Sequence, residues 1–263
     1  MAKCEKKDEF LASDITGLNL EIGYAELRMV EEATDKIEVV ANLEEEKLEK
    51  YQCEVTDEIL RVKAGNVDVR ISIFGDDKTF HKGEAAKDIV TITVPYGMKF
   101  NEMKLELGAG TAKLSNPSNT YTYVKTEVGA GKLMAEGMQV EEVMEIEVGA
   151  GTAELKDFCA KKANLECGVG TMRMRGSVEG DIDVNCGVGT IEMDLDAVEN
   201  DYNYHIDCAV GAVVINGSKR GGLFSSRSSV SNPNAKGTIN LECGVGKIEL
   251  MTRKRIAEAK YSF

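Results

Sequence analysis

A short glycine motif recurs seven times between residues 108 and 246, each time after a stretch in which apolar and polar residues alternate. Six copies read G-A-G or G-V-G, and one reads Ala209-Val210-Gly211. The copies begin at residues 108, 129, 149, 168, 187, 209 and 244, at intervals of 21, 20, 19, 19, 22 and 35 residues. A period near 20 is typical of a solenoid, in which stacking buries apolar faces that one repeat cannot bury alone. The repeat therefore predicts an all-β solenoid.

Each copy has the pattern of two strands joined at the glycines. Before the motif at Gly187, Ile182, Val184 and Cys186 alternate with Asp183 and Asn185. Successive side chains of a strand point to opposite faces, so the apolar set is expected to face the core and the polar set to face solvent.

The glycines are interpreted as a corner. Strict inward–outward alternation from Cys186 to Met193 would bury Glu192, so the alternation must shift by one residue within the motif. A bulge at the Gly189–Thr190 step would produce this shift. This interpretation predicts that Val188 points inward. A phosphate-binding loop would need a helix after the glycines, whereas each copy is followed by another strand.

Composition and charge narrow the function classes. The chain has 263 residues, 43% of them hydrophobic, and a net charge of −13. Nucleic acids and anionic membranes attract clustered Lys and Arg, so neither is an expected partner. We find no apolar stretch long enough for direct membrane insertion and no signal segment, which predicts a cytoplasmic protein. The cell envelope is the alternative if Met1 replaces a removed leader or anchor.

Four of the seven cysteines share one position of the repeat. Cys167, Cys186, Cys208 and Cys243 stand where other copies carry Leu or Val directly before the glycine. We expect reduced thiols packed as small apolar residues, with a disulfide or a metal site as alternatives. The odd number of cysteines favours a reducing compartment.

An outward acidic row is the main candidate for a partner surface. One equivalent position is occupied by Glu106, Glu127, Glu147, Glu166, Asn185, Asp207 and Glu242. Neighbouring charges about 4.8 Å apart repel by roughly 0.9 kcal/mol in water, which is tolerable without a bound cation. A solvated face and a surface for a cation or a basic partner both remain open.

An insertion over residues 217–237 is the second candidate. It is rich in Ser and Gly, and its candidate binding residues are Lys219, Arg220, Leu223, Phe224 and Arg227. Inserted loops in repeat proteins often make the contacts, and a plain connecting loop is the alternative.

No catalytic, cofactor-binding or metal-binding residues are predicted. G-x-S-x-G, H-E-x-x-H and C-x-x-C are all missing, and His81 and His205 belong to no metal or nucleophile motif. We therefore expect no enzyme activity and no cofactor.

Two parts of the chain differ in regularity. Residues 1–100 read as short strands, including one over Val67–Phe74, and are expected to form an irregular cap continuous with the solenoid. Residues 101–263 are expected to form the regular coils, interrupted by the insertion over residues 217–237.

The passage ITVPYGMKFNEMKLELGAGTAKL, with the EVGAG and ECGVG copies after it, resembles a bacterial putative-adhesin-like domain of unknown function, a G-x-G repeat β-solenoid family. The resemblance implies a right-handed single-stranded parallel β-helix, no catalytic residues and frequent association with the cell envelope. Two functions follow as alternatives: an adhesin-like module that binds an unknown protein or glycan, or a scaffold that self-assembles as a homo-oligomer like the bactofilins.

Overall fold

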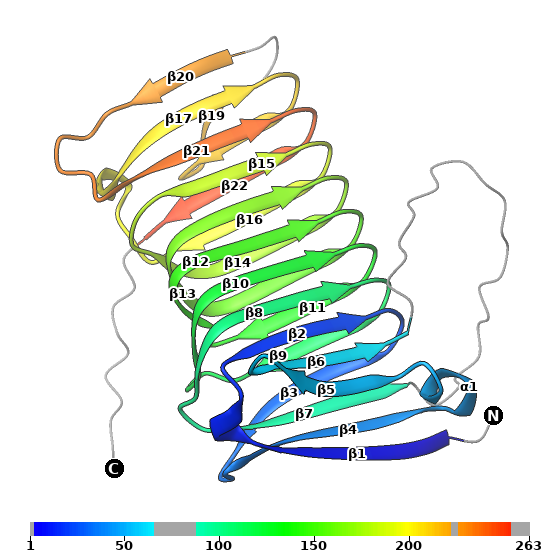
Figure 1. Ribbon diagram of the computed structural model, residues 1–263. Helices are drawn as coiled ribbons and strands as arrows, with labels where there is room; N and C mark the ends of the chain where they lie inside the picture. Colours follow the sequence, from blue (N-terminus) through cyan, green and yellow to red (C-terminus); the bar gives the residue numbers. More distant parts are fainter. Residues whose placement is uncertain (1–2, 66–87, 222–225, 254–263) are drawn as a thin grey trace, which may run out of the picture.

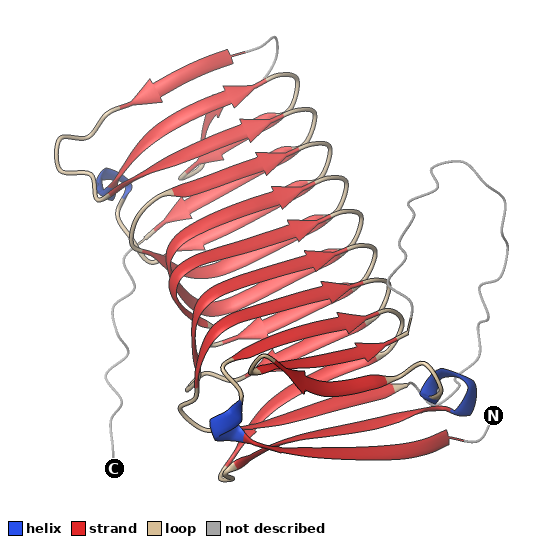
Figure 2. Cartoon of the chain, viewed as in Figure 1, coloured by secondary structure: helices blue, strands red, loops and turns tan. Residues whose placement is uncertain are grey.

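The computed structural model describes residues 3–65, 88–221 and 226–253. Within these residues, 22 strands belong to one sheet, and only three short helical turns interrupt them (Figures 1 and 2). The elements are β1 (Lys3–Leu11), η1 (Ala12–Asp14), β2 (Gly17–Ile22), β3 (Glu26–Glu32), β4 (Lys36–Glu44), α1 (Glu45–Leu48), β5 (Gln52–Thr56), β6 (Ile59–Ala64), β7 (Ile89–Pro95), β8 (Lys99–Leu107), β9 (Thr111–Ser115), β10 (Thr120–Val128), β11 (Lys132–Glu136), β12 (Gln139–Val148), β13 (Thr152–Cys167), β14 (Thr171–Val178), β15 (Ile182–Cys186), β16 (Thr190–Leu195), η2 (Glu199–Asp201), β17 (Tyr202–Cys208), β18 (Ala212–Ile215), β19 (Ser218–Gly221), β20 (Ser226–Val230), β21 (Gly237–Cys243) and β22 (Lys247–Thr252).

The repeat forms a strand, a glycine corner and a second strand, which we call a repeat unit. Strands that precede the corners lie side by side on what we call the front face, in the order β2, β8, β10, β12, end of β13, β15, β21 and β17. Strands that follow the corners form the back face, in the order β3, β9, β11, start of β13, β14, β16, β22 and β18. The two faces enclose one elongated core (Figure 1).

The expected right-handed single-stranded parallel β-helix is wrong for this chain. The sheet is mixed: β1 with β4, β4 with β7, β5 with β6, β17 with β20 and β18 with β19 are antiparallel pairs. The fold is all-β, but its architecture is barrel-like, because a mixed sheet curls around the core. Alternation of apolar residues indicates which side of a strand is buried, and it is the same for parallel and antiparallel neighbours.

The units also do not stack in chain order. The last unit, β21 and β22, pairs with β15 and β16 on one side and with β17 and β18 on the other. The inserted strands β19 and β20 run antiparallel along β18 and β17. The chain thus passes the end of the sheet and returns to place its last unit between two earlier ones, an order that repeat spacing does not predict.

The predicted core side chains are confirmed. Ile182, Val184 and Cys186 are at most 2% exposed, and the equivalent residues of the other units are buried in the same core. The region before β8 joins this core through a unit at Gly23, since β2 pairs with β8 and β3 with β9. The strand expected over Val67–Phe74 lies outside the described residues.

The corner glycines are required by close stacking, not by an unusual backbone conformation. None of the motif glycines has a positive φ among the described residues. A Cβ at the second glycine of a copy would lie only 2.2–2.6 Å from a carbonyl oxygen of the neighbouring unit. A Cβ at the first glycine would lie 2.8–3.0 Å from the nearest oxygen, as at Gly108, Gly168, Gly187 and Gly244. Neighbouring units therefore approach each other most closely at the second glycine.

The prediction that Val188 points inward is wrong. Val188 is 59% exposed, while Gly189 is buried. The phase of the alternation changes between Gly187 and Val188, two steps earlier than expected, so the middle residue of the motif faces solvent. Bringing the second glycine to the inside is what permits the close approach of neighbouring backbones.

Candidate functional site

The acidic position forms one unbroken row across the front face. Strand register places its members side by side, flanked by a basic residue at each end, in the order Lys63, Glu21, Glu106, Glu127, Glu147, Glu166, Asn185, Glu242, Asp207 and Arg227. The structure thus brings together all six acidic residues that the repeat singled out, together with Asn185. We call this set the acidic row.

Sequence reasoning missed part of this row. Glu21 stands two residues before Gly23, as Glu106 does before Gly108. The less regular unit at Gly23 thus carries an acidic residue at the same repeat position, which the sequence could have revealed. Lys63 and Arg227 lie on irregular or inserted strands and carried none. The order also differs from the chain, because Glu242 lies between Asn185 and Asp207.

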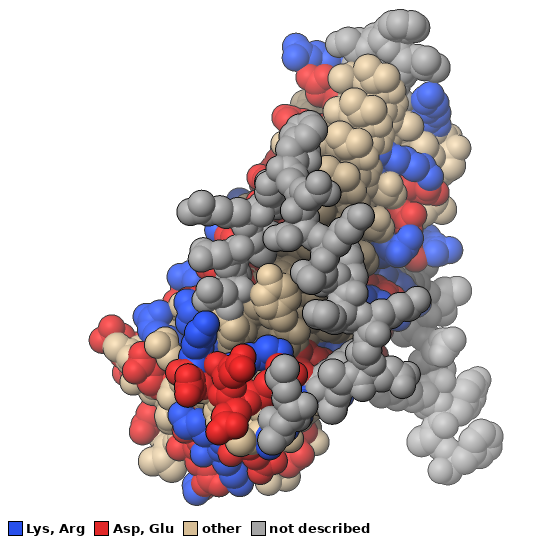
Figure 3. All heavy atoms as spheres, turned by 90° about the vertical axis from the view of Figure 1, so that its right-hand side faces the viewer, with Lys and Arg blue, Asp and Glu red and all other residues tan. Residues whose placement is uncertain are grey.

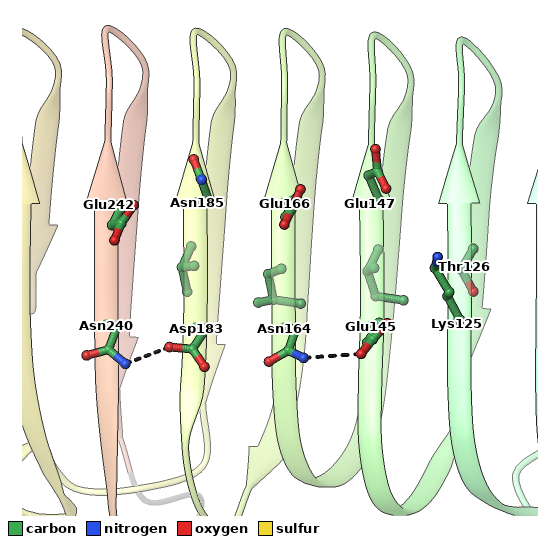
Figure 4. Close-up of a pocket in the computed structure, with 13 residues that line it drawn as sticks. Lys125, Thr126, Glu145, Glu147, Asn164, Glu166, Asp183, Asn185, Asn240 and Glu242 are labelled. Atoms are coloured by element: carbon green, nitrogen blue, oxygen red, sulfur yellow. Dashed lines mark hydrogen bonds between the residues drawn. The ribbon is translucent and has the colours of Figure 1, made fainter.

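A second polar row runs beside the first, two residues upstream on each strand. Its members are Lys104, Lys125, Glu145, Asn164, Asp183, Asn240 and His205. Figure 4 shows the two rows side by side, with the amide of Asn240 donating to Asp183 (2.6 Å) and that of Asn164 donating to Glu145 (3.3 Å). The amides hold two carboxylates of this row in place.

The two rows line a shallow groove. Its main part, from Lys125 to Glu242, has a volume of about 490 Å³. A second depression of about 420 Å³ continues around His205, Asp207 and Arg227 and shares Asn240 and Glu242 with the first. Among the described residues, no Phe, Tyr or Trp side chain lines either depression. We call the two depressions together the front groove.

Charge compensation is concentrated at the ends of the acidic row. Lys63 lies 2.5 Å from Glu21, and Arg227 lies 2.7 Å from Asp207. In the interior, Glu127 pairs with Lys125 at 2.7 Å. Glu147, Glu166 and Glu242 make no ion pair within the described part of the chain. The centre of the front groove therefore carries uncompensated negative charge.

Electrostatic repulsion acts within the acidic row. Burial raises the pKa of Glu106, and the neighbouring charges of Glu21 and Glu127 raise it further. The raised pKa means that the folded protein holds this carboxyl more readily in its neutral form. A bound cation would relieve the same repulsion.

Carboxylates of the back face are arranged differently. Glu154 pairs with Lys156 at 3.0 Å and Glu192 with Arg173 at 2.9 Å. Asp194 likewise pairs with Arg253 at 2.6 Å. These three carboxylates are neutralised by neighbouring cations, unlike Glu147, Glu166 and Glu242 in the middle of the front face.

Three residues of the predicted binding loop lie on strands of the sheet. Arg220 of β19 pairs with Glu199 at 3.1 Å, and Arg227 of β20 belongs to the end of the acidic row. Lys219 lies on β19 and is exposed. Leu223 and Phe224 lie outside the described residues.

The chemistry offered by the front groove is that of hydrogen-bond acceptors. Within residues 3–65, 88–221 and 226–253, no group of three or more His, Cys, Asp or Glu side chains could hold a metal ion. The same residues contain no helix with the length and hydropathy of a membrane span. Carboxylate and amide oxygens in a row can accept from ammonium and guanidinium groups.

Comparisons with solved structures give distant similarities. The chain is similar to a putative cell adhesion protein from Clostridium sporogenes (15% identity, 96% of this chain, 100% of that chain, TM-score 0.40). It is also similar to a putative adhesin from Bacteroides fragilis (13%, 95% and 98%, 0.44) and to a putative lipid binding protein from Parabacteroides distasonis (14%, 94% and 96%, 0.36). No protein-family model and no curated protein matches. These similarities do not identify a ligand.

Proposed function

We propose that this protein is a non-catalytic binding module whose front groove holds an extended cationic segment of a partner protein. The observation that carries the proposal is the uncompensated charge of Glu147, Glu166 and Glu242 at the centre of the acidic row. Lysine and arginine side chains are the natural complement of such a row.

The front groove suits a long ligand better than a small one. It crosses the strands from β10 to β20, and neighbouring strands lie about 4.8 Å apart, so six steps give a length of roughly 29 Å. An extended segment of about nine residues covers this distance. Each exposed ion pair contributes about 0.2–1 kcal/mol, so binding should be weak per contact, cumulative and sensitive to salt.

A glycan is the less favoured ligand. Its hydroxyl groups could donate to Asn164, Asn185 and Asn240, but a neutral sugar would leave the central carboxylates without a counter-charge. We therefore retain the glycan as an outcome of the test.

End-to-end self-assembly also receives less support. The last front and back strands at the C-terminal end, β17 and β18, are covered by the antiparallel strands β20 and β19. At the other end, β1 is an edge strand that carries Lys3, Lys6 and Lys7. Lysine side chains on an edge strand are a typical device against edge-to-edge pairing.

Calorimetric titration with oligolysine tests the proposal. The variant is Glu147→Gln/Glu166→Gln/Glu242→Gln, and the control is Glu136→Gln/Glu154→Gln/Glu192→Gln, which removes the same charge from the back face. We expect the front variant to lose most of the affinity and the control to keep it. Equal loss in both variants would show that only net charge matters, and tighter binding of a neutral oligosaccharide would favour the glycan.

A further inference from the structure

The middle residues of the glycine corners form a continuous apolar ridge. In spatial order, the members of this corner ridge are Tyr24, Ala109, Ala130, Ala150, Val169, Val188, Val245 and Val210. From Ala109 on, each backbone N–H donates to the carbonyl oxygen of the first corner residue in the neighbouring unit, at 2.8–2.9 Å. The corner ridge is therefore as regular as the sheet.

The corner ridge is exposed. Val169, Val188, Val245 and Val210 are 68%, 59%, 60% and 66% exposed, and Tyr24 is 71% exposed. Figure 3 views the molecule from the side of the corners and shows a column of uncharged side chains with charged residues on both sides. Exposed apolar patches of a few hundred Å² commonly mark interaction sites.

The four valines are not explained by the fold. Alanine occupies the same corner position in three units, at Ala109, Ala130 and Ala150, so the corner does not need a larger side chain. The valines are neighbours in space although Val245 follows Val210 in the chain, because the last unit lies between two earlier ones. One half of the corner ridge is therefore a contiguous valine patch.

The valine patch has an acidic flank without an intervening side-chain barrier. Between Glu166 and Val169 the chain has only the buried Cys167 and the exposed Gly168. Glu242 and Asp207 hold the same position before Val245 and Val210, and Asn185 holds it before Val188. On the far flank stand Thr171, Thr190, Lys247 and Ala212. A ligand that covers the valine patch would thus have carboxylates along one edge only.

We propose that the corner ridge docks an amphipathic helix of a partner protein, whose apolar stripe packs on the four valines and whose basic edge reaches the acidic row. The proposal rests on the proposed function, since the basic edge of the helix would meet the same row of carboxylates, from the corner ridge and not from within the front groove. Helical turns rise about 5.4 Å and the valines repeat about every 4.8 Å, so the two patterns diverge by only about 2 Å over three steps. An apolar stripe at i, i+4, i+7 and i+11 has one residue per turn and so supplies one contact per valine.

Charge argues against a second copy of this chain as the occupant. Each copy carries a net charge of −13. Packing the valine half of one corner ridge on the alanine half of another requires antiparallel ridges, and a twofold axis across them would set the two acidic rows on the same side. A basic partner avoids this repulsion.

Two synthetic peptides of about 18 residues test the proposal: one has a leucine stripe flanked by lysines, and the other has the same composition in scrambled order. The variant is Val169→Ser/Val188→Ser/Val245→Ser, and Val198→Ser is a control at an exposed valine outside the corner ridge. Serine is close in size to the alanine that other corners tolerate, and thermal melts check that the variants fold. Affinities are measured by fluorescence anisotropy, and the oligomeric state by analytical ultracentrifugation.

We expect wild-type protein to bind the striped peptide about tenfold more tightly than the scrambled one. The valine variant should lose this difference and keep its affinity for the scrambled peptide. The Val198→Ser control should bind both peptides as the wild-type protein does. Unchanged preference for the striped peptide in the valine variant would overturn the helix proposal while leaving the cationic groove intact. Failure of both peptides to bind wild-type protein would overturn both proposals, and a dimer abolished by the valine variant would assign the corner ridge to a second copy instead.

Discussion

Replacing the second glycine of a corner should destabilise the protein far more than replacing the first. At Gly189, a new Cβ would lie 2.5 Å from the carbonyl oxygen of Gly170 and 2.7 Å from the sulfur of Cys167. Ordinary contacts begin at 3.4 Å, so the two units would have to separate locally by nearly 1 Å. Such a separation would stretch the bond from the N–H of Thr190 to Gly170, which is already 3.1 Å long.

The cost can be estimated from these contacts. Overpacking costs about 1–3 kcal/mol and a weakened hydrogen bond about 1 kcal/mol, while the stiffer unfolded chain returns about 0.4–1 kcal/mol. Gly189→Ala should therefore lower the free energy of unfolding by about 2 kcal/mol, a fall in Tm of roughly 4–8 °C. At Gly187, the nearest oxygen lies 3.0 Å from a new Cβ, and one natural copy carries Ala209 there. Gly187→Ala should therefore be nearly neutral.

Thermal and urea melts followed by circular dichroism give the comparison. A large loss for Gly189→Ala beside a small change for Gly187→Ala would support close stacking as the reason for the motif. Equal effects of the two substitutions would refute it, because both would then reflect the backbone conformation of the corner as a whole.

Three further predictions concern the core and the acidic row. Thr126 is fully buried and its hydroxyl has no hydrogen-bond partner among the described residues, so Thr126→Val should raise the free energy of unfolding by about 1 kcal/mol in a urea melt, whereas Thr126→Ser should lower it. The pKa of Glu106 is raised in the folded state, so the contribution of this carboxyl to stability is present at low pH and is lost as the pH rises. Glu106→Gln should therefore raise Tm at neutral pH and have little effect at acidic pH. An equal gain at both pH values would contradict this. Burial raises the pKa of the four cysteines that share one repeat position, Cys167, Cys186, Cys208 and Cys243, to about 11 for Cys208. Ellman's reagent should therefore label these four only after denaturation, when all seven cysteines react; fewer than seven would indicate a disulfide.

The buried side of the sheet could be predicted from sequence, but the partners of its strands could not. Alternation places Ile182 and Val184 in the core because each strand has one buried face. The same alternation holds for antiparallel neighbours, so it did not predict the mixed ends of the sheet. Nothing local in β21 indicates that it lies between β15 and β17, because that order depends on how β19 and β20 pair with β18 and β17.

The candidate site was predictable to a similar extent. One repeat position sufficed to bring Glu106, Glu147 and Glu166 into one row, since parallel register aligns equivalent residues. The corner ridge was missed because the phase change was placed after Val188 instead of before it, which assigned the most exposed position of the motif to the core. Ion pairs at the ends of the row involve Lys63 and Arg227, which lie outside the regular repeats.

The location of a bound polycation tests the central claim most directly. Oligolysine with a nitroxide at its end, added to isotope-labelled protein, broadens the NMR signals of residues near the nitroxide. We predict broadening at Asn164, Asn185 and Asn240 of the front groove, with no effect at Thr152 and Arg173 of the back face. Broadening centred on the back face, or spread evenly over both faces, would contradict a specific cationic site at the acidic row.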